Sequence, residues 1–236
     1  MTLSTAPCCG FQLIRITLFV FFGITAMLKA RAEIPTSGCL FATTVGDGAE
    51  EVSVGSCHHP DPLELARNPQ VLKLIAAIGV KPELISFSGC PGNLYALRLE
   101  AGGRYVVTYP PEIKDGFLAP VAHELAHIVQ SEAAGGYVKL IERYRSRRIE
   151  LGADYVAGIL FRQVLPEASR NIFQNHVKLK GLYRESLDGA HGTPNQRTSA
   201  FRMGVVGRIQ KTGAGLAESS EHFQEDIYAR IVLYSD

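Results

Sequence analysis

The sequence predicts an α+β fold, in which a small N-terminal strand-rich part precedes a mainly helical core. Two observations support this prediction. Between residues 84 and 109, short runs rich in β-branched and aromatic residues alternate with turn residues, which is typical of strands. From Pro120 onward, apolar residues recur with helical spacing. Strands followed by a run of helices are characteristic of α+β domains.

The first 32 residues are expected to form a signal peptide. Arg15 precedes an apolar run over residues 16–28, and Ala30-Arg31-Ala32 resembles a cleavage site with small residues at both required positions. A run of 13 apolar residues is short beside the roughly 20 needed to cross a bilayer. Lys29 and Arg31 disfavour translocation, so an uncleaved anchor is the alternative. We expect an exported protein, periplasmic or secreted, without a membrane span in its mature chain.

The mature chain is expected to be one domain in three parts. These are an N-terminal strand and helix part over 33–92, a core over 93–207 and a C-terminal helix over 208–236. Hydrophobic residues make up 46% of the sequence and charged residues 20%, so a packed core is expected. A net charge of +1 is too balanced for a nucleic-acid-binding protein.

Three cysteines remain after removal of the leader, and all precede the helical core. An oxidising compartment favours a disulfide between two of them. The sequence leaves open which pair forms among Cys39, Cys57 and Cys90.

Each element has its own local signal. Residues 63–77 look helical with a break at Asn68-Pro69, and Gly102-Gly103 is a hairpin turn between two of three strands. Gly135-Gly136 and Pro166 end helices. The expected strands cover 84–88, 94–99 and 104–109, and the expected later helices cover 121–132, 137–144, 148–165, 167–187, 194–203 and 218–233.

The segment from His123 to His127 reads His-Glu-Leu-Ala-His, an H-E-x-x-H motif. Residues four apart on a helix share a face, so both imidazoles can reach one metal ion. Glu124 lies about 100° around the helix from His123, where its carboxylate can act as the general base. The other possibility is a buried helix with two hydrogen-bonded histidines.

A catalytic zinc site needs a third protein ligand and an open position for water. Glu150 and Asp154 are the candidates, because they lie four apart on a mostly apolar helical segment. Acidic side chains on such a helix need a partner. We expect Glu150 to bind the metal and Asp154 to accept a hydrogen bond from a ligand imidazole.

This arrangement resembles the gluzincin pattern, an H-E-x-x-H motif followed by E-x-x-x-D. It is similar to the family of CAAX prenyl endopeptidases, HtpX-type stress peptidases and periplasmic quality-control peptidases, and to bacterial neutral zinc metallopeptidases. The resemblance covers about residues 120–207. It implies a minigluzincin-like core, one Zn²⁺ per chain and an endopeptidase that cleaves peptides or unfolded proteins through a zinc-activated water.

The same resemblance implies roles for two residues further along the chain. In those families a histidine followed six positions later by an arginine lies near the zinc. Here His191 would stabilise the oxyanion, and Arg197 would position Asp154 or the substrate. The simpler interpretation is that Thr193 caps a helix beginning at Pro194, with His191 in the preceding loop.

Two further expectations remain open. Strand 104–109 precedes the motif helix and is either an edge strand that pairs with a substrate peptide or an interior strand. In the first case the substrate-binding residues would be Arg104, Tyr105, Val106 and Val107. The alternative to an enzyme is a catalytically silent zinc-binding scaffold or chaperone of the cell envelope, and the oligomeric state cannot be predicted.

Overall fold

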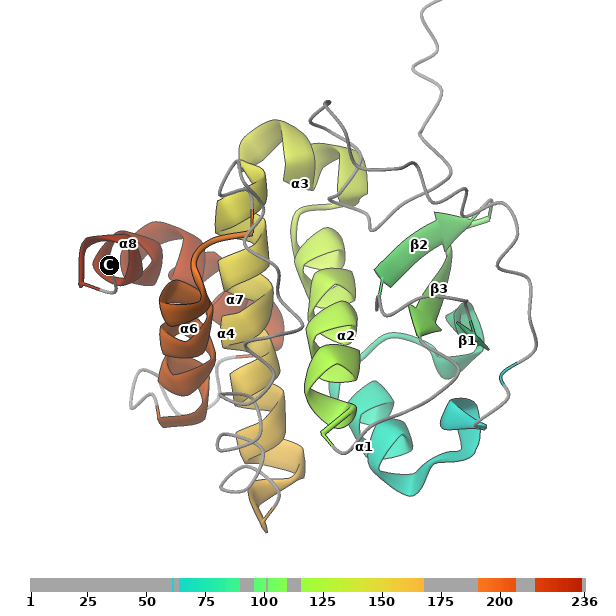
Figure 1. Ribbon diagram of the computed structural model, residues 1–236. Helices are drawn as coiled ribbons and strands as arrows, with labels where there is room; N and C mark the ends of the chain where they lie inside the picture. Colours follow the sequence, from blue (N-terminus) through green and yellow to red (C-terminus); the bar gives the residue numbers. More distant parts are fainter. Residues whose placement is uncertain are drawn as a thin grey trace, which may run out of the picture. The chain divides into compact units, whose positions relative to one another are not determined.

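The computed structural model describes residues 61, 64–89, 96–100, 102–109, 116–167, 191–206 and 215–234 (Figure 1). Every described residue belongs to one compact unit within Pro35–Asp236. The expected signal peptide and the three candidate disulfide cysteines lie outside the described residues. So does the expected helix 167–187, apart from its first residue.

The break expected at Asn68-Pro69 separates a 3₁₀ turn from an α-helix. A 3₁₀ turn, Leu65–Arg67, is followed by α1, Pro69–Ala77. The Asn68 side chain accepts hydrogen bonds from the backbone N–H groups of Gln70 and Val71, at 2.9 and 3.3 Å. Proline suits the first helical position, since its missing N–H would lack an intrahelical partner there. Asn68 and Pro69 therefore start a helix.

A three-stranded mixed sheet follows. It consists of β1 (Ile85–Gly89), β2 (Ala96–Glu100) and β3 (Arg104–Tyr109) in the order β1-β3-β2. The predicted hairpin is confirmed, because β2 and β3 pair antiparallel with Glu100 opposite Arg104. Gly102 and Gly103 have φ values of 84° and 78°, which favour glycine, and they close the turn.

Of the two alternatives for strand 104–109, the interior strand is confirmed and the edge strand is wrong. β3 lies in the middle, parallel to β1 on one side and antiparallel to β2 on the other. These neighbours occupy both of its hydrogen-bonding edges from Tyr105 to Thr108, so the backbone of Tyr105, Val106 and Val107 cannot add a substrate strand, and Arg104 is paired with Glu100 of β2. Residues Tyr105 to Tyr109 are all buried, as expected for an interior strand.

Helices form the remainder of the described chain. α2 spans Leu118–Ala133, α3 spans Tyr137–Arg143 and α4 spans Ser146–Val164. α2 begins earlier than the sequence predicts, so Pro120 is its third residue and still lies in the first turn, where a proline costs no hydrogen bond. Gly135 and Gly136, with φ values of 77° and 123°, separate α2 from α3.

The C-terminal region differs more from expectation. α6 covers Pro194–Val206, and α7 covers Leu216–His222. The single helix expected over 218–233 contains a π-helical segment, Phe223–Ile227, before α8, Tyr228–Tyr234. A π segment adds a residue to the turn and shifts the face that the following side chains occupy.

The helices and the sheet are arranged in layers around α2 (Figure 1). α2 contacts β2 and β3 on one side and α4 on the other, and α4 in turn packs against α6. Every residue of α2 from Leu118 to Ser131 is buried. The described part of the chain is thus an α+β structure dominated by helices, and no described helix is long and apolar enough to span a membrane.

Part of the contact between α4 and α6 is made directly by backbone atoms. Gly158 and Gly204 face each other, and a β-carbon at Gly158 would overlap the carbonyl oxygen of Phe201. A β-carbon at Gly204 would overlap the carbonyl oxygen of Tyr155. Glycine at both positions therefore permits the close approach that brings α6 against the middle of α4.

Candidate metal centre

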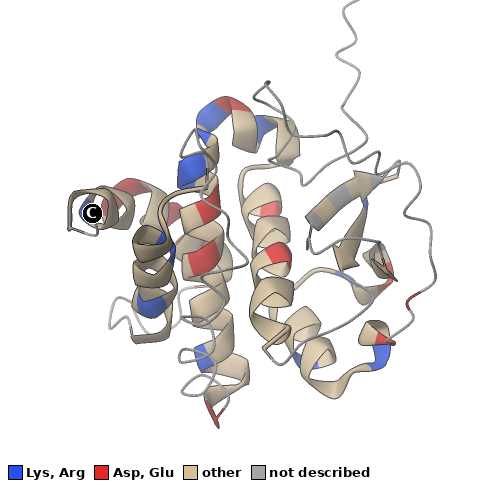
Figure 2. Ribbon diagram, in the orientation of Figure 1, with Lys and Arg blue, Asp and Glu red and all other residues tan. Residues whose placement is uncertain are grey.

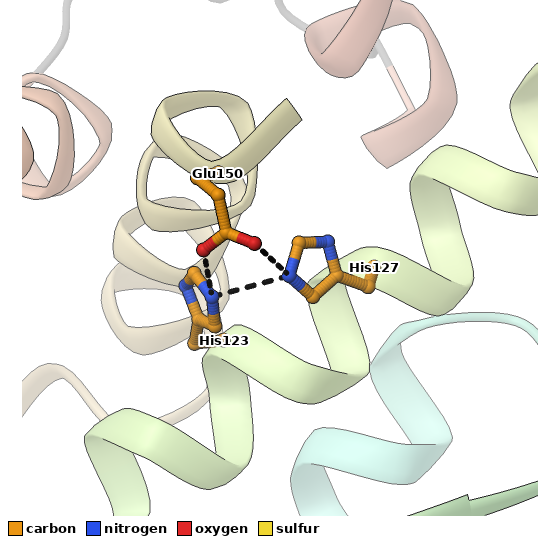
Figure 3. A group of neighbouring side chains, drawn as sticks. All are labelled: His123, His127 and Glu150. Atoms are coloured by element: carbon orange, nitrogen blue, oxygen red, sulfur yellow. Dashed lines mark hydrogen bonds and ion pairs between the residues drawn. The ribbon is translucent and has the colours of Figure 1, made fainter. Parts of the chain in front are cut away.

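His123 and His127 lie one turn apart on α2 and direct their imidazoles toward Glu150 of α4 (Figure 3). The two Nε2 atoms are 3.2 Å apart. Glu150 Oε2 lies 3.2 Å from His123 Nε2, and Oε1 lies 3.6 Å from His127 Nε2. One ligand atom from each of the three residues lies within 4.8 Å of the others. The sequence-predicted ligands are thus brought together.

These side chains fit a divalent metal ion. Glu150 Oε1 is buried and has no hydrogen-bond partner among the described residues, which is costly for a carboxylate oxygen. The Nε2 atoms of His123 and His127 face each other and the same carboxylate. A cation at their centre would satisfy all three groups. Two His ligands and one Glu ligand are a known set for catalytic zinc.

The partner of the His123 ring is Asp154, which also forms an ion pair with Arg197. His123 Nδ1 is 2.9 Å from Asp154 Oδ1, as expected for a residue that orients a ligand ring. Arg197 Nε donates to Asp154 Oδ2 at 2.7 Å, and its Nη2 donates to Oδ1 at 3.0 Å. Arg197, on α6, is only 4% exposed. The contact expected between Arg197 and Asp154 is therefore present.

The corresponding partner of His127 is a neutral amide, Gln130, a contact that the sequence did not predict. Gln130 Oε1 lies 2.9 Å from His127 Nδ1, and Gln130 Nε2 donates to the carbonyl oxygen of Ile149 at 2.9 Å. Gln130 is one turn beyond His127 on the buried α2. A polar residue three positions after a ligand was the available signal, but its partner on α4 could not be predicted.

Glu124 is 3% exposed, and its Oε2 has no hydrogen-bond partner among the described residues. Burial raises the pKa of Glu124 to about 7, with nearby His123 opposing the rise and Glu150 adding to it. A carboxyl group with a pKa near neutrality can both accept and release a proton at physiological pH.

The charges of the surrounding groups depend on each other. Burial lowers the pKa of His123, but the Asp154 carboxylate outweighs it and brings the value to about 10. Burial, reinforced by His123, lowers the pKa of His127 to about 3. Burial opposes ionisation of Glu150 and Asp154, yet adjacent cationic groups hold both pKa values below their usual range. Figure 2 shows acidic positions on α2 and α4 and basic positions on α6.

His191 lies at the more open side of the cluster. Its Nδ1 is 3.3 Å from Glu150 Oε2, and its side chain is 29% exposed. The hydrogen bond to Glu150 raises the pKa of His191, although partial burial opposes the rise. Thr193 Oγ1 also accepts a hydrogen bond from the Gln196 N–H at 3.2 Å. His191 thus contacts the ligand cluster while Thr193 caps α6.

Strand β3 contacts the site helix away from the metal ligands. The Tyr105 hydroxyl donates to Glu132 Oε1 at 2.6 Å. Burial, with Glu132 beside it, raises the pKa of Tyr105 to about 12, so this hydroxyl remains protonated. The contact connects the sheet to the C-terminal end of α2.

Comparisons with known proteins place the chain in no family. No family model and no solved structure matches it. It is similar to the non-structural polyprotein pORF1 of hepatitis E virus genotype 1, isolates Human/China/HeBei/1987, Human/Burma and Human/Pakistan/Sar-55. Each is 26% identical over 162 residues, which is 67% of this chain. The matched part is 9% of each polyprotein, so the similarity does not extend to the viral protein as a whole.

Proposed function

We propose that this chain is a zinc-dependent endopeptidase that acts on peptides or unfolded proteins in envelope or extracellular quality control. The strongest support is that His123, His127 and Glu150 converge around one point. Glu124, on the same helix as the two histidines, has a buried carboxylate oxygen without a hydrogen-bond partner among the described residues. The resemblance to gluzincins and the expected signal peptide support the peptide substrate and the compartment.

His123, His127 and Glu150 would hold the zinc ion. When bound, zinc would activate a water molecule and polarise the scissile carbonyl. Asp154 keeps the His123 ring oriented by its hydrogen bond to Nδ1, and Arg197 holds that carboxylate in place. These residues would supply three protein ligands, the number found in hydrolytic zinc sites that bind water in the remaining position.

Glu124 and His191 would carry the proton transfer and the charge stabilisation. Glu124 takes a proton from the attacking water and delivers it to the leaving amine. His191, with Nδ1 directed at Glu150, has Nε2 left to donate toward the developing oxyanion when the ring is protonated. Its partial exposure places it where an incoming peptide has access.

Glu124→Gln tests the function directly. Glutamine keeps the shape of the side chain but cannot accept the proton. We expect the variant to bind zinc, to melt close to wild type and to lose about 10²–10⁴ in peptide hydrolysis rate. Zinc content by atomic absorption, thermal melting and cleavage of an unfolded protein substrate would be measured together.

The same variant separates an enzyme from a scaffold. Undiminished cleavage by zinc-loaded Glu124→Gln would exclude the mechanism. A wild-type protein that binds zinc but hydrolyses no peptide would favour the silent scaffold.

A further inference from the structure

Two glutamine side chains lie across the first turns of α4 where it carries Glu150. Gln130 of α2 donates from Nε2 to the Ile149 carbonyl oxygen at 2.9 Å, and Gln224 of the π segment donates from Nε2 to the Arg148 carbonyl oxygen at 3.4 Å. Both side chains are buried, at 1% and 2% exposure. Only the first of these amides also contacts a histidine.

Gly152 makes room for both amides. A β-carbon at this position would lie 2.5 Å from Gln130 Nε2 and 2.8 Å from Gln224 Nε2. Real β-carbons do not approach polar nitrogens so closely, so a side chain at 152 would displace them. The glycine two residues after Glu150 thus allows an α2 side chain to reach the backbone of α4.

The hydrogen bond to α4 determines which way the Gln130 amide points. A carbonyl oxygen only accepts, so the group facing Ile149 is the NH₂, and Oε1 faces His127. Because Oε1 also only accepts, His127 Nδ1 has to carry the proton. His127 Nε2, which lies 3.2 Å from His123 Nε2 and 3.6 Å from Glu150 Oε1, then carries no proton, the form in which imidazole binds a metal.

We propose that Gln130 is the positioning residue of His127, which selects the metal-binding tautomer and joins it to the helix that carries Glu150. This proposal rests on the proposed function, because it assigns a partner to one of the expected zinc ligands. Groups that hydrogen-bond the far nitrogen of a ligand histidine affect metal affinity by about 10–100-fold. Gln130 would act through His127 and touch neither metal nor substrate.

Gln130→Met tests the proposal, with Gln224→Met as the matched control. Both changes replace a buried amide that bonds to an α4 carbonyl, but only the first removes the partner of a histidine. We expect Gln130→Met to lower zinc affinity by about 10–100-fold, measured by chelator competition on the full mature chain. Its Co²⁺-substituted form should show shifted visible absorption bands. Gln224→Met should keep the wild-type zinc affinity and Co²⁺ spectrum.

Gln130→Glu is the rescue variant. Its carboxylate still accepts from His127 Nδ1, so we expect a zinc affinity above that of Gln130→Met, although the bond to the Ile149 carbonyl is lost. The proposal is overturned by wild-type zinc affinity in Gln130→Met, by an equal loss in Gln224→Met, or by a folded Gln130→Glu that binds zinc no better than Gln130→Met. A wild-type chain that binds no zinc would overturn the proposed function as well. These outcomes therefore distinguish the two failures.

Discussion

The two candidate ligand histidines, His123 and His127, differ in the group that contacts Nδ1 of each ring. His123 faces the carboxylate of Asp154, whereas His127 faces the neutral amide of Gln130. A carboxylate increases the electron density of the imidazole more than an amide does, so His123 should be the stronger donor. The negative charge that this requires is balanced by Arg197, which is buried beside Asp154.

Glu150→Ala and Asp154→Ala should therefore differ in effect. Removing Glu150 removes a ligand and should abolish stoichiometric zinc binding. Removing Asp154 leaves the ligands in place but weakens metal affinity or activity by about 10–100-fold. Zinc content after dialysis against a weak chelator would show the difference. If Asp154→Ala lost zinc while Glu150→Ala retained it, Asp154 would be the metal ligand and Glu150 the residue that supports a ligand.

His191→Ala should retain zinc and the fold while lowering turnover. A principal oxyanion donor contributes about 10²–10³ to kcat. Steady-state hydrolysis should show a reduced kcat with KM little changed, because the interaction forms only in the transition state. An unaltered kcat would show that His191 has no catalytic role and is only a loop residue before the Thr193 cap of α6.

At the residue scale the candidate ligands were predictable and their partners were not. His123 and His127 could be selected because helical spacing places them on one face, and Glu150 because it is one of two acidic residues on a mostly apolar helical segment. Asp154 shares the helix face of Glu150 and was selected in the same way. Gln130 depends on a contact between two helices whose relative placement no local pattern specifies. The position of His191 against Glu150 could be expected only from resemblance.

At the element scale, the helix pair α4 and α6 determines whether Arg197 can reach Asp154. The two helices touch through Gly158 and Gly204. Gly158→Ala would normally stabilise a helix by about 1 kcal/mol. Here the new methyl group meets backbone atoms, which cannot change rotamer.

We expect Gly158→Ala to destabilise the protein by about 1–3 kcal/mol or more, as overpacking does. Urea unfolding monitored by circular dichroism would measure the change. Gly215→Ala is the control, because no atom lies within 4 Å of its new β-carbon. Its loss should be limited to the weaker helix-capping preference of alanine, about 1 kcal/mol. Equal losses in the two variants would argue against the backbone contact.

Elements were predicted best where a strong local signal exists. Glycines and Asn68-Pro69 mark turns and a helix start, and the structure follows them. Two features depended on tertiary packing. The central position of β3 follows from a parallel pairing with β1, a contact between separate segments. The π segment Phe223–Ile227 fits Phe223 against Tyr155 of α4, with ring centroids 5.3 Å apart, which periodicity alone cannot indicate.

At the scale of the whole molecule, one apolar cluster connects the sheet and the helices. It includes residues from Leu65 before α1 to Ile231 in α8. The candidate metal ligands lie on α2 and α4 within this core, which is built from apolar contacts. Folding of the described part should therefore not depend on the metal, unlike that of a zinc finger.

Chelation should consequently leave the protein folded but less stable. Zinc at 100 times its Kd would stabilise the native state by about 2.7 kcal/mol, and its removal should lower Tm accordingly. Far-ultraviolet circular dichroism should be unchanged by chelator at room temperature, and added zinc should restore Tm. Collapse of the helical signal on chelation would show that the ion is needed for folding.

The contact between Gly158 and Gly204 also has a volumetric consequence. Hydrostatic pressure unfolds proteins because unfolding eliminates internal voids. Where two helices meet through backbone atoms, with space for not even a methyl group, little void remains for pressure to remove. Hydrostatic pressure should therefore separate α4 from α6 less readily than it unfolds more loosely packed parts of the protein. The side of the metal centre built on Asp154 and Arg197 would be its least compressible part.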